Sequence, residues 1–231
     1  LGNSSGWYAG AVNNRLKFKD IGKSKEDTVM LKLGAFKSTA FDHNGSLKWT
    51  VSGEGFVSES RMNRRFLVVD EIFSAKSNYY AYGAAVKNEI SKEFRTSERT
   101  SIRPYGSFKL EYGKVDNIKE KTGEVRLEVK ENDYYSIVPE VGVEFKYRQP
   151  FAARSIFIAS LGLGYEKELG NVFNSGNKVR VSYTSADWFN IRGEKDNRKG
   201  KVRADLNFGI ENSRVGMTLN TGYDSDNNNL R

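Results

Sequence analysis

The chain has 231 residues, with 37 Lys and Arg against 29 Asp and Glu, one His and no Cys, and its formal net charge is +8. Aromatic residues make up 13% of it, glycine is abundant at 22 residues and proline is scarce at 3. This composition excludes a disordered chain, a collagen-like repeat and a disulfide scaffold. No apolar run approaches the roughly 18 residues of a transmembrane helix, so average hydropathy alone would class the chain as soluble. The residue pattern argues otherwise.

Apolar and polar residues alternate with a period of two along most of the chain, which is typical of β-strands with two different faces. In 201–211, for example, Val202, Leu206 and Ile210 share one face while Arg203 and Asp205 share the other. The expected strands, in chain order, are 7–18, 28–41, 47–57, 80–90, 102–112, 124–130, 135–147, 157–166, 178–191, 201–211 and 214–223. No helical period of useful length and no boundary between domains interrupts them.

Strand length distinguishes a membrane barrel from a soluble sandwich. Strands of soluble proteins usually have about five or six residues, whereas a tilted strand that crosses a bilayer needs about 9 to 11. The main alternating segments here run for roughly 10 to 14 residues, and their polar faces carry charges of both signs. Only a closed barrel leaves no unpaired backbone edge in lipid. The sequence therefore predicts an all-β, antiparallel up-and-down transmembrane β-barrel.

Aromatic residues cluster at the ends of the alternating segments, where the two interfacial girdles of a membrane barrel would lie. They are Trp7, Tyr8, Tyr79, Tyr80, Tyr112, Tyr134, Tyr135, Tyr147, Tyr165, Trp188, Phe189 and Tyr223. The alternative reading is that Tyr and Phe favour strands in any protein. The girdle reading is preferred for the set as a whole.

Connection lengths were used to assign topology, because outer-membrane barrels have short periplasmic turns and longer extracellular loops. This rule makes 42–45 and 131–134 short periplasmic turns and 59–77 a long extracellular connection. It likewise makes 192–200 extracellular and 212–213 periplasmic. Two connections fit poorly, because 149–153 is short for an extracellular loop and 168–177 is long for a periplasmic turn.

Five segments, in their order and spacing, resemble the autotransporter β-domain, the translocator of type V secretion. They are GWYAG (6–10), RPYGSFKLEYG (103–113), SIVPEVGVEFKY (136–147), LGLGYEKELG (161–170) and LNFGIENSRVGMTLNTGYD (206–224). Each motif alone is mostly alternation plus glycine, but their ordered succession along nearly the whole chain is more specific.

The resemblance implies a twelve-stranded barrel in the bacterial outer membrane, at the C-terminus of a protein whose N-terminal passenger is exported to the cell surface. It implies a linker helix through the lumen and a final strand that ends on an aromatic residue. Residues 1–231 are expected to form one barrel domain of about eleven strands that lacks both of these. The implied partners are outer-membrane lipid, the passenger in cis and the barrel assembly machinery.

We expect the polar face to line a hydrated lumen. The candidate lumen-facing residues are Lys48, Glu54, Arg103, Lys109, Glu140, Glu144, Lys146, Arg203 and Asp205. The acids among them are expected to pair with Lys48, Lys146 and Arg203 rather than to act as catalysts.

No enzymatic activity, metal or cofactor is expected. The single histidine, His43, lies in a turn sequence, where a solvated side chain is far more common than a general base. The excess positive charge is spread among acids rather than gathered on one side, so nucleic acid is not an expected partner. Two alternatives remain open: a porin-like or adhesin barrel without a passenger, and a large soluble β-sandwich that binds a partner.

Overall fold

The structure is a computed structural model that describes residues 3–151, 155–171, 176–191, 200–212, 216–225 and 229–230. Every regular element in these residues is a β-strand. The strands are β1 (Ser4–Lys17), β2 (Lys25–Ala40), β3 (Leu47–Val68), β4 (Glu71–Lys92), β5 (Phe94–Arg95), β6 (Thr100–Val115), β7 (Ile118–Thr122), β8 (Leu127–Val129), β9 (Asn132–Phe151), β10 (Ser155–Glu166), β11 (Asn177–Val181), β12 (Phe189–Ile191), β13 (Lys201–Glu211), β14 (Gly216–Asp224) and β15 (Asn229–Leu230). The described residues contain no helix that could serve as a membrane span.

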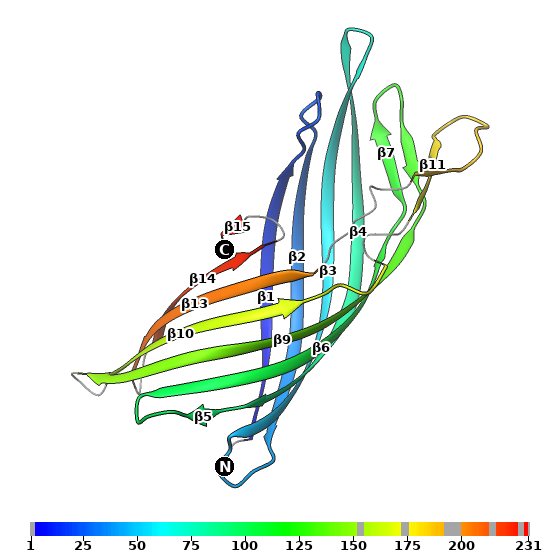
Figure 1. Cartoon of the computed structure of the whole chain (residues 1–231). Helices are drawn as coiled ribbons and strands as arrows, with labels where there is room; N and C mark the ends of the chain where they lie inside the picture. The colour runs from blue at the N-terminus through cyan, green and yellow to red at the C-terminus, as the bar shows by residue number, and fades with distance from the viewer. Residues whose placement is uncertain are drawn as a thin grey trace.

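Nine of the described strands form one antiparallel meander in the order β1-β2-β3-β4-β6-β9-β10-β13-β14. The sheet is strongly curled, so that β9, β10 and β13 run across the direction of β1 to β4 (Figure 1). Right-handed strand twist accumulates into such curling when many long strands pair in succession. The all-β, antiparallel up-and-down fold expected from the sequence is therefore confirmed.

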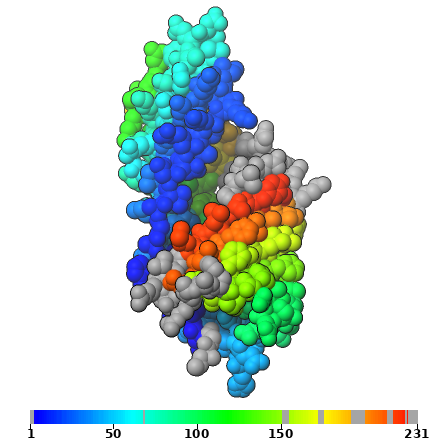
Figure 2. Space-filling model, turned by 90° about the vertical axis from the view of Figure 1, so that its left-hand side faces the viewer, coloured from blue at the N-terminus to red at the C-terminus, as the bar shows by residue number. Residues whose placement is uncertain are grey.

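The two edges of this sheet are β1 and the β14–β15 end. Within the described residues, β1 pairs only with β2, and β14 pairs only with β13 and the short β15. Both ends of the sheet are visible from one side of the molecule, with β1 in blue and β13 and β14 in orange and red (Figure 2).

Two expected strands lie outside the meander. β6 pairs directly with β9, and β10 pairs directly with β13. The segments 124–130 and 178–191 are consequently only partly strand, and they form β8, β11 and β12 beside β7. These short strands continue outward from β4 through the pairing of β7 with it. Alternation identified them as strands but carried no information about their partners, so the expected count of eleven barrel strands included two that the barrel does not use.

The corrected meander places its two longest connections at the same end. One end carries the connections between β2 and β3, β4 and β6, β9 and β10, and β13 and β14, none longer than the seven residues of 93–99. The other end carries the long connections between β6 and β9 and between β10 and β13, together with the seven residues of 18–24 and the two-residue tip of the β3–β4 hairpin. The two connections that fitted poorly now agree with the rule, since β9 and β10 are joined at the short end and 168–177 falls within the long connection between β10 and β13. Residues 192–199 and Ser213, for which the sequence predicted an extracellular loop and a periplasmic turn, lie outside the described residues.

Two other assigned connections differ from the structure. The segment 59–77 is not an open loop, because β3 and β4 continue as paired strands of 22 residues each and project beyond the sheet (Figure 1). The expected periplasmic turn 131–134 lies at the end of the long connections, because 124–130 does not cross the sheet.

The distribution of polar and apolar side chains over the two faces of the meander is the inverse of that in a soluble protein. Large apolar side chains are exposed, among them Leu33 at 63% and Val141 at 61%, whereas serines and glutamates such as Ser160 and Glu140 are buried. An apolar surface of this extent is not tolerated on a monomer in water. In lipid it is the expected outer face of a barrel.

The apolar band has the height of a bilayer. It runs from Trp49 to Val57 in β3 and from Val202 to Ile210 in β13, nine residues in each. A membrane strand needs about 9 to 11 residues. Beyond Val57 the same face of β3 continues with Glu59 and then Arg61, so the band ends there.

A row of exposed tyrosines follows the boundary of the band at the end of the long connections. It consists of Tyr82, Tyr112, Tyr135, Tyr165 and Tyr223. Tyr112 and Tyr135 are direct cross-strand partners. Tyr223 is the cross-strand partner of Ala204, which lies on the outward face. Several aromatic residues from the sequence-based set do not belong to the row: the hydroxyls of Tyr8 and Tyr134 donate to glutamates on the other face, and Phe189 lies in β12.

Candidate functional site

The polar face of β4, β6, β9 and β13 carries a cluster of charged side chains around a hollow of about 380 Å³. Its lining residues are Lys87, Glu89, Arg103, Tyr105, Glu140, Glu144, Gly162, Arg203, Asp205, Asn207 and Asn220. Strand alternation places these side chains on one face of six successive strands, with β10 between β9 and β13 contributing only Gly162 and β14 contributing Asn220. We call this set the polar cluster. Five of the sequence-predicted residues belong to it: Arg103, Glu140, Glu144, Arg203 and Asp205.

Glu140 of β9 is the most fully bonded member of the polar cluster. Its Oε1 accepts a hydrogen bond from the Tyr105 hydroxyl at 2.8 Å, and its Oε2 accepts one from the Ser107 hydroxyl at 3.1 Å. The Lys87 ammonium lies 3.2 Å from the same Oε2. The Glu140 side chain is only 8% exposed. A buried carboxylate is tolerated only when it is paired and hydrogen-bonded, and these three contacts meet that condition.

Arg103 of β6 bridges two strands. Its guanidinium donates to Glu144 of β9 at 2.7 Å and to Glu89 of β4 at 2.8 Å. Lys146 lies 3.6 Å from Glu144, on the far side of that carboxylate. An arginine can serve two carboxylates in this way because its guanidinium presents several donors in a fixed plane.

The charges of the polar cluster and Lys146 balance. The positive groups are Lys87, Arg103, Lys146 and Arg203, and the negative groups are Glu89, Glu140, Glu144 and Asp205. Each of these carboxylates has a cation within 4 Å, which for Asp205 is Arg203 at 2.8 Å. The face is thus strongly polar without a net charge in this region.

The remaining predicted residues lie on the same face but outside the polar cluster. Glu54 is 3.5 Å from Lys32 and accepts a hydrogen bond from the Tyr8 hydroxyl at 3.0 Å. Lys109 pairs with Glu111 at 2.6 Å. Lys48, opposite buried Ser91, forms no ion pair with any described residue. The expected pairing of the acids is therefore right for Lys146 and Arg203 and wrong for Lys48.

Sequence reasoning missed Lys87, Glu89, Tyr105 and Lys32. All four lie at polar-face positions of alternating segments, so the signal for their facing was present. The sequence held no signal for the register between strands, because the register depends on the pairing of β4 with β6 and of β6 with β9.

A second group of buried ion pairs holds together the short strands at the end of the long connections. The Arg64 guanidinium donates to both carboxylate oxygens of Glu120 in β7, at 2.6 and 2.8 Å. Arg180 of β11 donates to Glu128 of β8 at 2.7 Å, and its guanidinium lies 4.6 Å from the ring of Trp188. Hydrogen bonds from Arg180 hold the pKa of Glu128 below its usual range.

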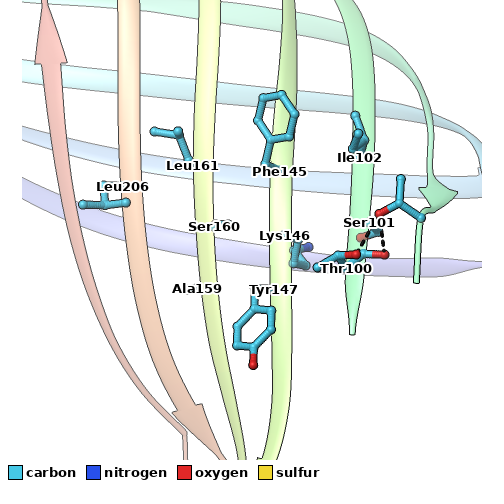
Figure 3. A pocket seen from close by; sticks show the side chains of 11 residues that line it. Thr100, Ser101, Ile102, Phe145, Lys146, Tyr147, Ala159, Ser160, Leu161 and Leu206 are labelled. Atoms are coloured by element: carbon cyan, nitrogen blue, oxygen red, sulfur yellow. Dashed lines mark hydrogen bonds between the residues drawn. The ribbon is translucent and has the colours of Figure 1, made fainter. Parts of the chain in front are cut away.

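An apolar depression of about 460 Å³ lies on the other face, near the short connections. Ile102, Phe145, Leu161 and Leu206 occupy one cross-strand row there, and the last three lie side by side in neighbouring strands (Figure 3). Its apolar lining belongs to the band, so the depression is a feature of the lipid-facing surface rather than part of the polar cluster.

The polar cluster offers a wall of paired charges and hydroxyls rather than a reactive centre. Its carboxylates are engaged by cations, and His43 lies away from it in the 41–46 turn. Across the described ranges, no three His, Cys, Asp or Glu side chains are placed to hold a metal ion. Such a wall can stay hydrated and can accept transient hydrogen bonds from a polypeptide.

Comparison with known proteins gives a consistent result. A family model described as the autotransporter beta-domain matches residues 2–222. The solved translocator domain of the autotransporter NalP from Neisseria meningitidis superposes with a TM-score of 0.65 at 13% identity, covering 99% of this chain and 71% of that one. The beta domain of the Bordetella autotransporter BrkA gives a TM-score of 0.54 at 11% identity, covering 100% and 95%. No curated protein sequence matches.

Proposed function

The chain belongs to the autotransporter β-domain family, and from this premise we propose that its polar face lines a hydrated passage that accommodates the exported passenger. The protein is an outer-membrane translocator barrel of bacteria that anchors and exports an N-terminal passenger. The observation that carries the proposal is the inverted polarity of the two faces. The exposed face is apolar, and the buried face holds the polar cluster, whose charges balance together with Lys146.

The direction of the passage follows from the connections. Longer loops face outward in outer-membrane barrels, so we place 116–131, 167–200 and the β3–β4 tip at the cell surface. Ser4, at the start of β1, pairs with Ser38 close to the 41–46 turn and is therefore at the periplasmic end. A segment that joins β1 to a passenger outside the cell must cross the full height of the band. The polar face is the route on which its backbone can stay hydrogen-bonded.

Closure of the barrel is the second part of the proposal. The unpaired backbone groups of β1 and β14 would each cost several kcal/mol in lipid. We propose that these backbone groups pair with additional strands of the same autotransporter, which agrees with the twelve-stranded barrel that the resemblance implies. Outer-membrane lipid along the apolar band, the passenger in cis and the barrel assembly machinery complete the proposed partners.

No chemical step is assigned to this domain. The charged groups of the polar cluster neutralise one another, which suits a wall rather than a catalyst. A porin-like barrel without a passenger would share the polar face, but the family match favours a translocator.

Crosslinking tests the passage directly, because the natural sequence of this chain has no cysteine. In the full-length protein with a stalled passenger, Asn207→Cys should form a disulfide with cysteines placed along the segment that precedes β1. The control is Leu206→Cys, the adjacent residue on the apolar face, and it should form none. Equal crosslinking at both positions, or none at Asn207, would contradict the proposal.

A further inference from the structure

Positive side chains gather on the outward face of β1 to β4 immediately beyond the apolar band, at the end of the long connections. Cross-strand pairing places Arg15, Asp27 and Arg61 in one row, and Lys17, Lys25 and Asn63 in the next. Over this face of the four strands the cations are Arg15, Lys17, Lys25, Arg61, Arg65 and Lys76, and the acids are Asp27 and Glu59. The six cations are exposed, and they exceed the acids by four charges.

The positive face leads into a hollow of about 640 Å³ at the turn between β1 and β2. Its lining residues are Lys17, Phe18, Lys19, Asp20, Lys23 and Lys25, which gives four positive charges against one negative. Asp20 is held within the turn, where its carboxylate accepts from the Ser24 backbone at 2.7 Å and from the Ser24 hydroxyl at 2.5 Å. These bonds keep the pKa of Asp20 low, so the carboxylate is ionised and the hollow carries a net charge of 4 − 1 = +3.

The hollow is fixed in position because the turn is anchored on β3. The Ser24 hydroxyl accepts from the Arg65 backbone N–H at 2.8 Å and lies 3.2 Å from the Arg65 carbonyl oxygen. Gly22 packs so closely on the same backbone that an added Cβ would lie 2.1 Å from that oxygen. Lys23 adopts a left-handed φ of 55°, which an ordinary side chain rarely does.

Lys17 and Lys25 are direct cross-strand partners. Like charges directly opposite each other destabilise a sheet, and the two acids of the outward face are already engaged, Asp27 by Arg15 at 2.5 Å and Glu59 by Arg61 at 3.1 Å. An external anion between the two ammonium groups would relieve this repulsion.

We propose that the lysine hollow of the β1–β2 turn binds the phosphate groups of a glycolipid in the outer leaflet. The position supports a lipid rather than a free anion. Lys25 is six residues beyond Leu31, the cross-strand partner of Val57 at the end of the band, which is about 20 Å along the strand and on the side of the band where lipid headgroups lie. Phe18 and Ile21, 41% and 78% exposed, supply an apolar contact beside the lysines. The inference rests on the proposed orientation, with this end at the cell surface.

Binding of a bisphosphorylated glycolipid to the folded barrel in detergent tests the site, with the dephosphorylated lipid and inorganic phosphate as further arms. The variant Lys17→Gln/Lys25→Gln should bind the bisphosphorylated lipid about 25-fold more weakly, since one lysine near an anionic surface is worth a factor of about five. The matched control is Lys37→Gln/Lys92→Gln, two exposed lysines at the other end of the same strand faces, and it should change binding less than twofold. Without lipid, the first variant should be at least as stable as the natural chain, because it removes the opposed pair.

Equal weakening in the two double variants, or equal binding of the dephosphorylated lipid, would overturn the site. Inorganic phosphate that binds as tightly as the lipid would overturn the lipid as ligand. A separate measurement checks the orientation: Ile21→Cys should react with a membrane-impermeant maleimide on intact cells. Labelling only after permeabilisation would refute the proposed orientation and the inference with it, whereas surface labelling without lipid binding would refute the inference alone.

Discussion

An arginine placed at Leu206 tests the lipid-facing assignment of the apolar band most directly. Leu206 is the central one of five outward residues of β13, between Val202 and Ile210. Leu206 is four positions from each of these residues. This spacing is about 13 Å along the strand, or about 10 Å along the membrane normal for a strand tilt near 40°. Since the apolar band of such barrels is about 25 Å tall, Leu206 sits near the midplane, where an arginine costs about 2–4 kcal/mol. The unfolding equilibrium constant should therefore rise by about 30- to 700-fold.

The neighbouring substitution Asn207→Arg is the control, because it introduces the same residue into the same strand on the polar face. Asn207 contributes one hydrogen bond, to the Ser160 hydroxyl at 3.2 Å, so the cost there should be about 1 kcal/mol or less. Denaturant unfolding in lipid vesicles, followed by the fluorescence of the three tryptophans, measures both variants. Equal destabilisation by the two arginines would refute the assignment of the faces.

Three further predictions concern ion pairs. Glu140→Ala removes the carboxylate 3.2 Å from Lys87 and leaves Glu89 at 3.8 Å, so it should lower the unfolding free energy by about 1–3 kcal/mol; an unchanged denaturant midpoint would contradict the role given to this residue. Arg64→Ala should release β7 from the β3–β4 hairpin, so that limited proteolysis cuts near Glu120 while the barrel stays folded, and an unchanged cleavage pattern would argue against this. The lowered pKa of Glu128 means that its pairing stabilises the short strands above pH about 4.5 and that this contribution is lost as the pH falls through the folded-state value; the protection factors of the β8 amides, corrected for the intrinsic exchange rate at each pH, should therefore fall on acidification, and much less in Glu128→Gln.

The sequence predicted the fold class because alternation is a local property of each strand. Val202 and Leu206 lie on one face of β13 whatever the neighbouring strand is. Partner choice is not local, which is why 124–130 and 178–191 were counted as barrel strands. Their pattern is that of a strand, but β6 pairs with β9 and β10 with β13 around them. The poor fit of 149–153 and 168–177 to the rule on connection length was the sign that the strand count was wrong.

The polar cluster was predictable to the same extent. Alternation shows which face of the sheet each side chain lies on, so it identifies Arg103, Glu140 and Glu144 as polar-face residues. Their actual partners depend on register, since Arg103 reaches Glu89 across one strand boundary and Glu144 across another. The lysine hollow could not have been found this way, because it is formed by a turn folded back on β3 rather than by a periodic pattern.

The polar cluster and Lys146 together carry balanced charge, which has a consequence for movement along the proposed passage. Four positive and four negative groups alternate across neighbouring strands, so the electrostatic potential changes sign over distances comparable to the screening length of about 8 Å and averages to nearly zero. A charged residue that slides past meets shallow wells and low barriers of similar size in either direction. If the passenger takes the proposed passage, we expect a nearly level energy profile for acidic and basic sequences alike, so that transit does not select the passenger by its composition.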